Sequence, residues 1–315
     1  MKPGVLVISH GSREAGWVKL VDEAVAAVAE SAVCRQAAVG SDVDGELSGA
    51  EAKAESGGTG GGAVSAMYGE AFGSAGAEAA KPESYSGKVP VVSAFLEIVE
   101  GRLIQDGIDR LEAEGVTELY VLPLFVSSGS THVDDIAQAF GVAPVSEARS
   151  GELAPFRVGA GTRVRFGLPI DDDADIAELL LGNILSLSAA PARERLLLVA
   201  HGSREPVFHG RWRSGMTRLA ERVRELGGFA GADIAMLLPN QAACRLRALQ
   251  RRYPGDTFIV VPLFLSEGYF TRTVIPGRLE GLDYRNNGRA LLPHPCIVRW
   301  MERQVGSWLS SFTSL

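Results

Sequence analysis

Three side chains that could bind a metal ion or move a proton each come just after a short apolar run in the first half of the chain. They are His10, Glu97 and His132. Imidazoles bind borderline divalent cations such as Co²⁺, Fe²⁺, Ni²⁺ and Zn²⁺, and they accept protons near neutral pH, as a carboxylate can. The three side chains therefore suit either a metal site or proton transfer.

Each of these residues also has a simpler interpretation when it is taken alone. His10 could belong to a turn in which Gly11 relaxes the backbone and Ser12 caps a helix. Glu97 could be a favourable charge in the first turn of a helix, and His132 an ordinary surface residue. Only five histidines occur in the chain, and two of them follow predicted strands of one unit, so their joint placement favours a site.

An internal repeat organises the elements that must position these residues. The motif HGSRE occurs at 10–14 and again at 201–205, and PLF at 123–125 returns at 262–264. A weaker echo joins GLP at 167–169 to LLP at 291–293. Three matches in the same order indicate two copies of one unit. We predict an N-terminal domain over 1–188 and a C-terminal domain over 195–315.

Both copies show apolar strands that alternate with helices. Such strands are typical of parallel sheets covered on both faces, so each copy is predicted to be a small α/β domain of about four parallel strands flanked by helices. In the first copy we expect strands at 5–9, 89–95, 118–125 and 163–168, with helices at 17–33, at 97–114 and from 131 and 172. In the second we expect strands at 196–200, 232–238 and 257–265.

The first copy is longer than the second because of a segment of low complexity at about 36–88. Residues 40–87 hold 12 Gly, 10 Ala and a net charge of −6, which predicts too little apolar burial for a packed element. We interpret this segment as a surface insertion, and a lid over the site is the alternative.

Composition excludes several classes of partner. The net charge is −7, so no basic footprint for nucleic acid or an anionic membrane is present. Three cysteines without a CxxC pair indicate neither a disulfide framework nor a thiolate zinc site. No signal peptide or membrane span is recognisable, so a cytoplasmic protein is expected. The duplication makes a monomer sufficient.

The second copy keeps only part of the site. His201 corresponds to His10, but Thr271 stands opposite His132, and no acidic residue occurs at the place that corresponds to Glu97. The chemistry is therefore expected in the first copy, with the second completing a cleft. Aromatic side chains that could line that cleft, or could be core instead, are Phe95, Phe125, Phe264, Tyr269 and Phe270.

The motif set HGSR at 10–13, FLE at 95–97 and PLFxxxGxxH at 123–132 resembles the CbiX-type sirohydrochlorin chelatases, which are class II chelatases. The two-copy organisation is similar to the long, two-domain form of that family. The resemblance implies ATP-independent insertion of Co²⁺ or Fe²⁺ into sirohydrochlorin, in cobalamin or siroheme biosynthesis. The metal is then a substrate, and no further cofactor is required.

Residue roles are carried over by the same motifs. The resemblance implies that His10 and His132 hold the metal and that His10 also takes a pyrrole proton. The macrocycle would be contacted by Glu97 and by Ser127, Ser128, Gly129, Ser130 and Thr131. Arg13 is added as a partner for the carboxylates of the macrocycle.

Two other functions stay open. One is a non-catalytic carrier of metal or tetrapyrrole. The other is a histidine phosphatase, although Ser9 rather than an arginine precedes His10. The choice between cobalt, iron and nickel also stays open, because imidazole affinity alone does not separate these metals in the cell.

Overall fold

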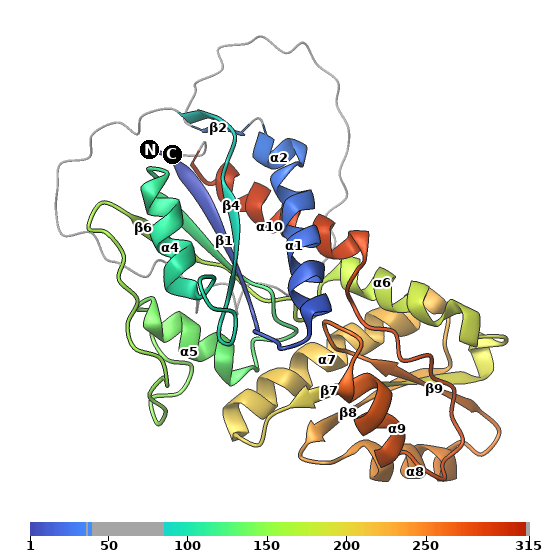
Figure 1. Cartoon of the computed structure of the whole chain (residues 1–315). Helices are drawn as coiled ribbons and strands as arrows, with labels where there is room; N and C mark the ends of the chain where they lie inside the picture. The colour runs from blue at the N-terminus through green and yellow to red at the C-terminus, as the bar shows by residue number, and fades with distance from the viewer. Residues whose placement is uncertain (36, 40–84, 313–315) are drawn as a thin grey trace, which may run out of the picture.

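The N-terminal lobe is built on a four-stranded parallel sheet (Figure 1). The structure is a computed structural model, and it describes residues 1–35, 37–39 and 85–312. The strands stand in the order β4-β1-β5-β6, all parallel, with bounds β1 Pro3–Ser9, β4 Val91–Phe95, β5 Glu118–Pro123 and β6 Arg163–Phe166. Because β1 is central, both of its faces are buried, as its continuous apolar sequence requires.

The C-terminal lobe repeats this plan with one strand fewer among the described residues. Its parallel sheet has the order β8-β7-β9, with bounds β7 Glu194–Gly202, β8 Gly231–Leu238 and β9 Thr257–Pro262. The predicted α/β class and the parallel sheets are confirmed, but the prediction of about four strands is wrong for this copy. A single bridge between Ile259 and Arg285 stands where β6 stands in the first lobe. The sequence there, DYRNNGRA at 283–290, lacks the apolar run of a buried strand.

Successive side chains on the central strands point to opposite faces of the sheet and so belong to different hydrophobic clusters. Val5 and Val7 on β1 join a hydrophobic cluster that also contains Leu196 and Leu198 on β7. Leu6, which points to the opposite face of its sheet, belongs to a second cluster confined to the N-terminal lobe. The facing sides of the two sheets therefore share one continuous core, which holds the lobes together.

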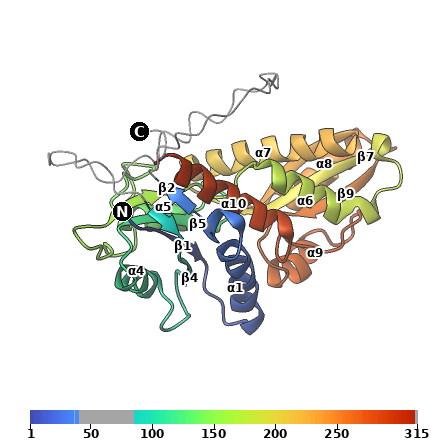
Figure 2. The same ribbon diagram turned by 90° about the horizontal axis from the view of Figure 1, so that it is seen from above.

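The lobes also exchange helices. The longer helices are α1 Ala15–Ala29, α4 Ile104–Ala113, α5 Thr131–Ala139, α6 Ala174–Ile184, α7 Pro206–Gly227, α8 Ala242–Arg252 and α10 Pro295–Ser310, and short ones are α2 Ala32–Arg35 and α9 Ile275–Arg278. Helix α6, from the first copy, packs along α7 of the second, and α10 returns to pack on α1, α6 and β5 (Figures 1 and 2). The division at 188 and 195 thus stays a prediction about the repeated sequence unit.

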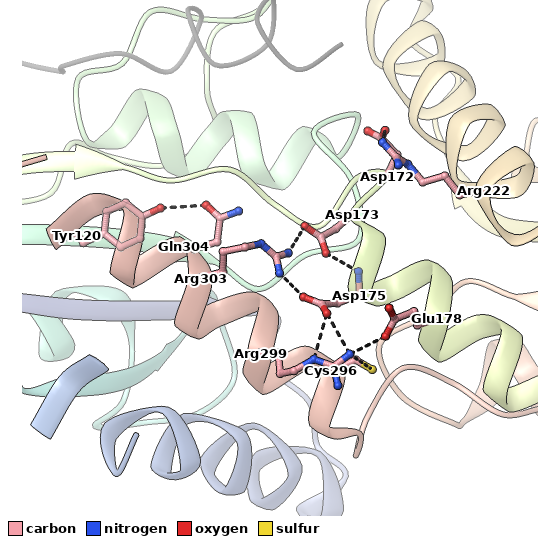
Figure 3. A network of polar contacts seen from close by, with 10 residues as sticks. All are labelled: Tyr120, Asp172, Asp173, Asp175, Glu178, Arg222, Cys296, Arg299, Arg303 and Gln304. Atoms are coloured by element: carbon pink, nitrogen blue, oxygen red, sulfur yellow. Dashed lines mark hydrogen bonds and ion pairs between the residues drawn. The ribbon is translucent and has the colours of Figure 1, made fainter. Parts of the chain in front are cut away.

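Two arginines on α10 bind the acidic start of α6 (Figure 3). Arg303 pairs with Asp173 at 2.5 Å and also with Asp175, while Arg299 pairs with Asp175 at 3.0 Å and with Glu178 at 2.8 Å. These pairs are half exposed, so each contributes little alone, but together they fix the returning helix.

One helix begins later than the apolar spacing predicts. The expected helix at 97–114 is α4, which starts only at Ile104. Ile98 and Gly101 both adopt positive φ, at 74° and 70°, which a helix cannot accommodate. The backbone N–H of Leu103 then donates to the Asp106 carboxylate at 2.8 Å and caps the delayed start.

The predicted insertion at 36–88 lies largely outside the described residues. At its two ends, β2 (Ala37–Val39) and β3 (Tyr85–Gly87) form an antiparallel pair. In the part of the chain that the structure describes, no helix is both long enough and apolar enough to cross a bilayer.

Candidate functional site

A cavity of about 710 Å³ lies between the lobes, at the carboxyl ends of their central strands. It is lined by His10 after β1, by His132 at the start of α5 and by His201 near the end of β7. Ligands of open parallel sheets bind at this edge, beyond the strand ends. The predicted cleft is therefore present, and both copies contribute to it.

The His10 and His132 rings meet edge to face. Their ring centroids are 5.0 Å apart and their planes are perpendicular, while Phe125 supports the His10 ring at 4.5 Å. The indole N–H of Trp17 donates to the His10 carbonyl at 2.6 Å and fixes its backbone. The two histidines predicted to hold a metal are thus neighbours on one wall.

Gly11 allows the backbone at Glu97 to pass very close to the residue that follows His10. A Cβ atom at Gly11 would lie 1.7 Å from the carbonyl oxygen of Glu97, so no other residue fits there without a backbone shift. The glycine of the first HGSR motif is therefore required by close packing, not by a positive φ.

His10 is held in its neutral form. Burial, reinforced by the nearby His132 and His201, lowers the pKa of His10 from 6.5 to about 4. A neutral imidazole keeps a nitrogen lone pair available at neutral pH, either to bind a cation or to accept a proton.

His132 is positioned by a buried ion-pair cluster on its own helix. Arg149, whose side chain is 14% exposed, binds Asp135 through two contacts of 2.6 and 3.1 Å and lies 3.4 Å from Asp134. The same guanidinium lies 3.6 Å from Glu205 of the other lobe, which lines the cavity. Arg149 therefore links the helix that carries His132 to the opposite side of the cleft.

Three of the five predicted substrate-contacting loop residues do not line the cavity. Ser127, Ser128 and Gly129 are buried, and both serine hydroxyls donate to Asp171 at 3.1 Å. Burial raises the pKa of Asp171, while these hydrogen bonds oppose the rise. A Cβ at Gly129 would lie 2.6 Å from Trp212 Cδ1, so this loop packs tightly against α7. Of the predicted five, Ser130 and Thr131 line the cavity.

Two further predicted residues lie outside the cavity wall. The side chains of Glu97 and Arg13 are exposed and do not line it. Glu97 was expected on this rim in the first turn of a helix, and the positive φ of Ile98 instead places it in a loop. Glu14, Arg204 and Glu205 line the cavity in their place, and all belong to the two HGSRE repeats.

His201 is the repeat counterpart of His10, and the sequence leaves open whether it binds a metal. It lines the cavity, and its Nδ1 lies 3.1 Å from the Gly202 carbonyl. A carbonyl accepts only, so Nδ1 is the donor in this contact and Nε2 is the ring nitrogen left to face the cavity. The repeat motif was the signal for this residue, but sequence alone does not bring the two copies face to face.

The expected aromatic lining is largely present. Phe125, Phe264, Tyr269 and Phe270 line the cavity, whereas Phe95 is fully buried in the core.

The donor set suits an ion that is bound and then released. Within the described residues, no group of three or more His, Cys, Asp and Glu side chains is placed to hold one metal ion. Two imidazoles on one wall would leave several coordination positions open to water or to an incoming ligand, unlike a closed structural site.

One protein-family model matches the chain twice. The CbiX model matches residues 70–186 and again 195–307, once in each half, which confirms the duplication. The first match begins after β1, so it includes Glu97 and His132 but not His10. Comparison with curated protein sequences gave no match.

Solved structures resemble the chain along its whole length. SirB from Bacillus subtilis, solved with Fe³⁺, has a TM-score of 0.62 at 15% identity, covering 97% of this chain and 94% of that one. The sirohydrochlorin chelatase SirB from Bacillus subtilis subspecies spizizenii, in complex with cobalt, has a TM-score of 0.56 at 15% identity, covering 99% and 97%. At such identities the likeness concerns the fold. Because its family model covers both halves, the chain belongs to the CbiX family.

Proposed function

We propose that this protein inserts a divalent metal, Co²⁺ or Fe²⁺, into sirohydrochlorin without ATP. The observation that carries the proposal is the pair of perpendicular imidazoles on one wall of a 710 Å³ cavity between the lobes. Family membership supports it. The fold neighbours include a protein described as the sirohydrochlorin chelatase SirB, in complex with cobalt, and SirB solved with Fe³⁺.

Metal insertion needs a site that binds the ion and then gives it up. His10 and His132 are proposed to replace part of the water shell of the ion and to aim it at the macrocycle. Two neutral ligands do not cage the ion, so four pyrrole nitrogens can compete for it. The buried ion pairs of Arg149 keep His132 in place during this exchange.

The reaction also releases two protons from the pyrrole nitrogens. His10 is neutral and half-buried, so it is proposed to accept one of them as the metal leaves its ring and to pass it to water. The second proton is proposed to pass directly to water in the cavity. Arg204 lines the cavity and is proposed to pair with a carboxylate of the macrocycle, the role first expected for Arg13. Glu97, being exposed, is proposed to act only at the rim.

The histidine-phosphatase alternative has no support in the cavity. A phosphate site needs several cationic donors. Among the described residues that line the cavity, Arg204 is the only arginine or lysine, and two carboxylates, Glu14 and Glu205, line it as well.

The experiment that tests the proposal is anaerobic insertion with the protein at a small fraction of the sirohydrochlorin concentration. Absorbance spectra follow Co²⁺ and Fe²⁺ separately, each corrected for spontaneous insertion. Many turnovers per protein support a chelatase and rank the two metals. Binding of the macrocycle without acceleration for either metal would overturn the proposal and identify a carrier.

A further inference from the structure

The two walls of the cavity have diverged in a specific way. When Gly129 is aligned with Gly268, Ser130 corresponds to Tyr269, Thr131 to Phe270 and His132 to Thr271. The wall of the first copy therefore presents two hydroxyls and an imidazole, whereas the equivalent stretch of the second presents two aromatic rings.

Thr271 shows that the second wall has lost the metal-holding position. Its side chain is only 2% exposed. Its hydroxyl accepts from the Gly268 N–H at 3.1 Å and lies 3.3 Å from the Gly268 carbonyl. The residue that replaces His132 thus turns inward and braces its own loop, where it is unavailable to a ligand.

The same loop holds its two aromatic residues out of the core. Tyr269 is 67% exposed and Phe270 is 37% exposed, although both line the cavity. A π-helical turn over Phe270–Val274 produces this arrangement, and such turns are frequent at functional sites.

Phe270 is the centre of an ordered aromatic cluster. Its ring stacks on Phe264 with centroids 5.3 Å apart and an interplanar angle of 13°. His201 meets it edge-on at 5.4 Å, and Tyr269 does so at 5.7 Å. Leu238, Leu263 and Leu265 extend the apolar surface around the cluster. A supported ring with exposed neighbours is suited to receive another flat ring.

We infer that Phe270, backed by Phe264, forms a stacking platform for one face of the planar macrocycle, and that Tyr269, whose ring is inclined at 65° to Phe270, contacts the macrocycle at its edge. His10 and His132 then deliver the metal to the other face. This inference rests on the proposed function for the identity of the macrocycle. The two copies then have different roles: the wall of the second copy binds and orients the macrocycle, and the wall of the first copy supplies the metal and accepts a proton. Tyr269 and Phe270 are then substrate-binding residues with no share in metal binding.

Two separate titrations test the platform. Binding of metal-free sirohydrochlorin is followed by its fluorescence, and binding of Co²⁺ without macrocycle is followed by visible absorption. Tyr269→Ala should weaken macrocycle binding about three- to tenfold, and the Tyr269→Ala, Phe270→Ala double variant about 10- to 100-fold, because each aromatic contact, stacked or edge-on, contributes modestly. Co²⁺ affinity should stay within twofold of wild type.

Matched variants exclude a general structural effect. Tyr269→Phe keeps a ring and should restore macrocycle binding, and Leu226→Ala removes another exposed apolar side chain, outside the cavity, and should leave both affinities unchanged. His132→Ala should show the reverse of the platform variants, with Co²⁺ binding lost and macrocycle binding retained.

The outcomes separate the platform from the proposed function. A double variant that binds the macrocycle as tightly as wild type, or that loses Co²⁺ affinity to the same extent, overturns the platform, even if wild type is an active chelatase. Wild type that binds the macrocycle through these rings but inserts no metal overturns the chelatase and keeps the platform. Wild type that does not bind the macrocycle overturns both.

Discussion

The neutral state of His10 has a measurable consequence for stability. Its pKa is lowered to about 4 in the folded chain, against an ordinary value of 6.5 that applies in the unfolded chain. Between these two pH values the unfolded chain binds a proton at His10 and the folded chain does not. The free energy of unfolding therefore falls as the pH falls through this window. Above pH 6.5, where His10 is neutral in both states, this loss of stability is absent.

The size of this effect follows from the difference of about 2.5 between the two pKa values. The limiting loss at low pH is about 3.4 kcal/mol, at 1.36 kcal/mol per pKa unit. Between pH 7.5 and 5.0 the loss reaches about 2 kcal/mol. Since His10 lines a cavity that water can enter, screening reduces the expected value to about 1–2 kcal/mol.

The assay compares wild type with His10→Gln, which cannot titrate. Urea unfolding at pH 7.5 and pH 5.0, followed by circular dichroism, gives the loss for each protein. Wild type should lose about 1–2 kcal/mol more than His10→Gln, because all other titrating groups are common to both. His209→Gln, at an imidazole outside the cavity, should behave as wild type does. Losses that agree within about 0.5 kcal/mol for wild type and His10→Gln would refute a half-buried His10 whose pKa is lowered in the folded chain.

Three further predictions concern packing, ion pairing and the rim. Gly129→Ala should destabilise the chain by about 1–3 kcal/mol in urea unfolding, because the new methyl group meets the backbone of α7. The control Gly182→Ala, in open space on α6, should be neutral or stabilising, and equal effects of the two substitutions would contradict close packing at Gly129. Arg149→Met should cost about 3–5 kcal/mol, since it leaves buried carboxylates without their ion-pair partner. Loss of the exposed pair in Arg224→Ala should have a far smaller effect, and an equally small effect of Arg149→Met would refute the buried cluster. Glu97→Gln should leave Co²⁺ affinity within twofold by titration, because this side chain does not line the cavity, and a tenfold loss would show that it ligates the metal.

The part of the site that the sequence predicted depends on parallel topology. His10 and His132 follow neighbouring strands, β1 and β5, and the carboxyl ends of parallel neighbours lie at one edge of a sheet. Two short apolar runs were therefore enough to bring these residues together. Glu97 follows β4 on the other side of β1, but the local backbone at Ile98 turns its side chain away from the cavity, and apolar spacing carries no signal for positive φ at an isoleucine.

The remaining features depend on contacts between distant segments. His201 was visible as a repeat of His10, yet its place opposite His10 depends on how the shared core joins the two sheets. Arg149 lies in a loop without a motif, and its role emerges only where it meets Asp135 and Glu205. The second sheet has three strands in the described part of the chain, and the polar sequence after β9 already indicates this, because NNG at 286–288 interrupts any apolar run.

The central claim is that the His10 and His132 pair delivers the metal that enters the macrocycle. The most direct test is the rate of anaerobic Co²⁺ insertion into sirohydrochlorin by wild type, His10→Ala, His132→Ala and the control His209→Ala. We expect each cavity variant to lose at least about 100-fold in kcat/KM, and the control to retain wild-type activity. Insertion by either cavity variant at a rate within a few fold of wild type would contradict the claim.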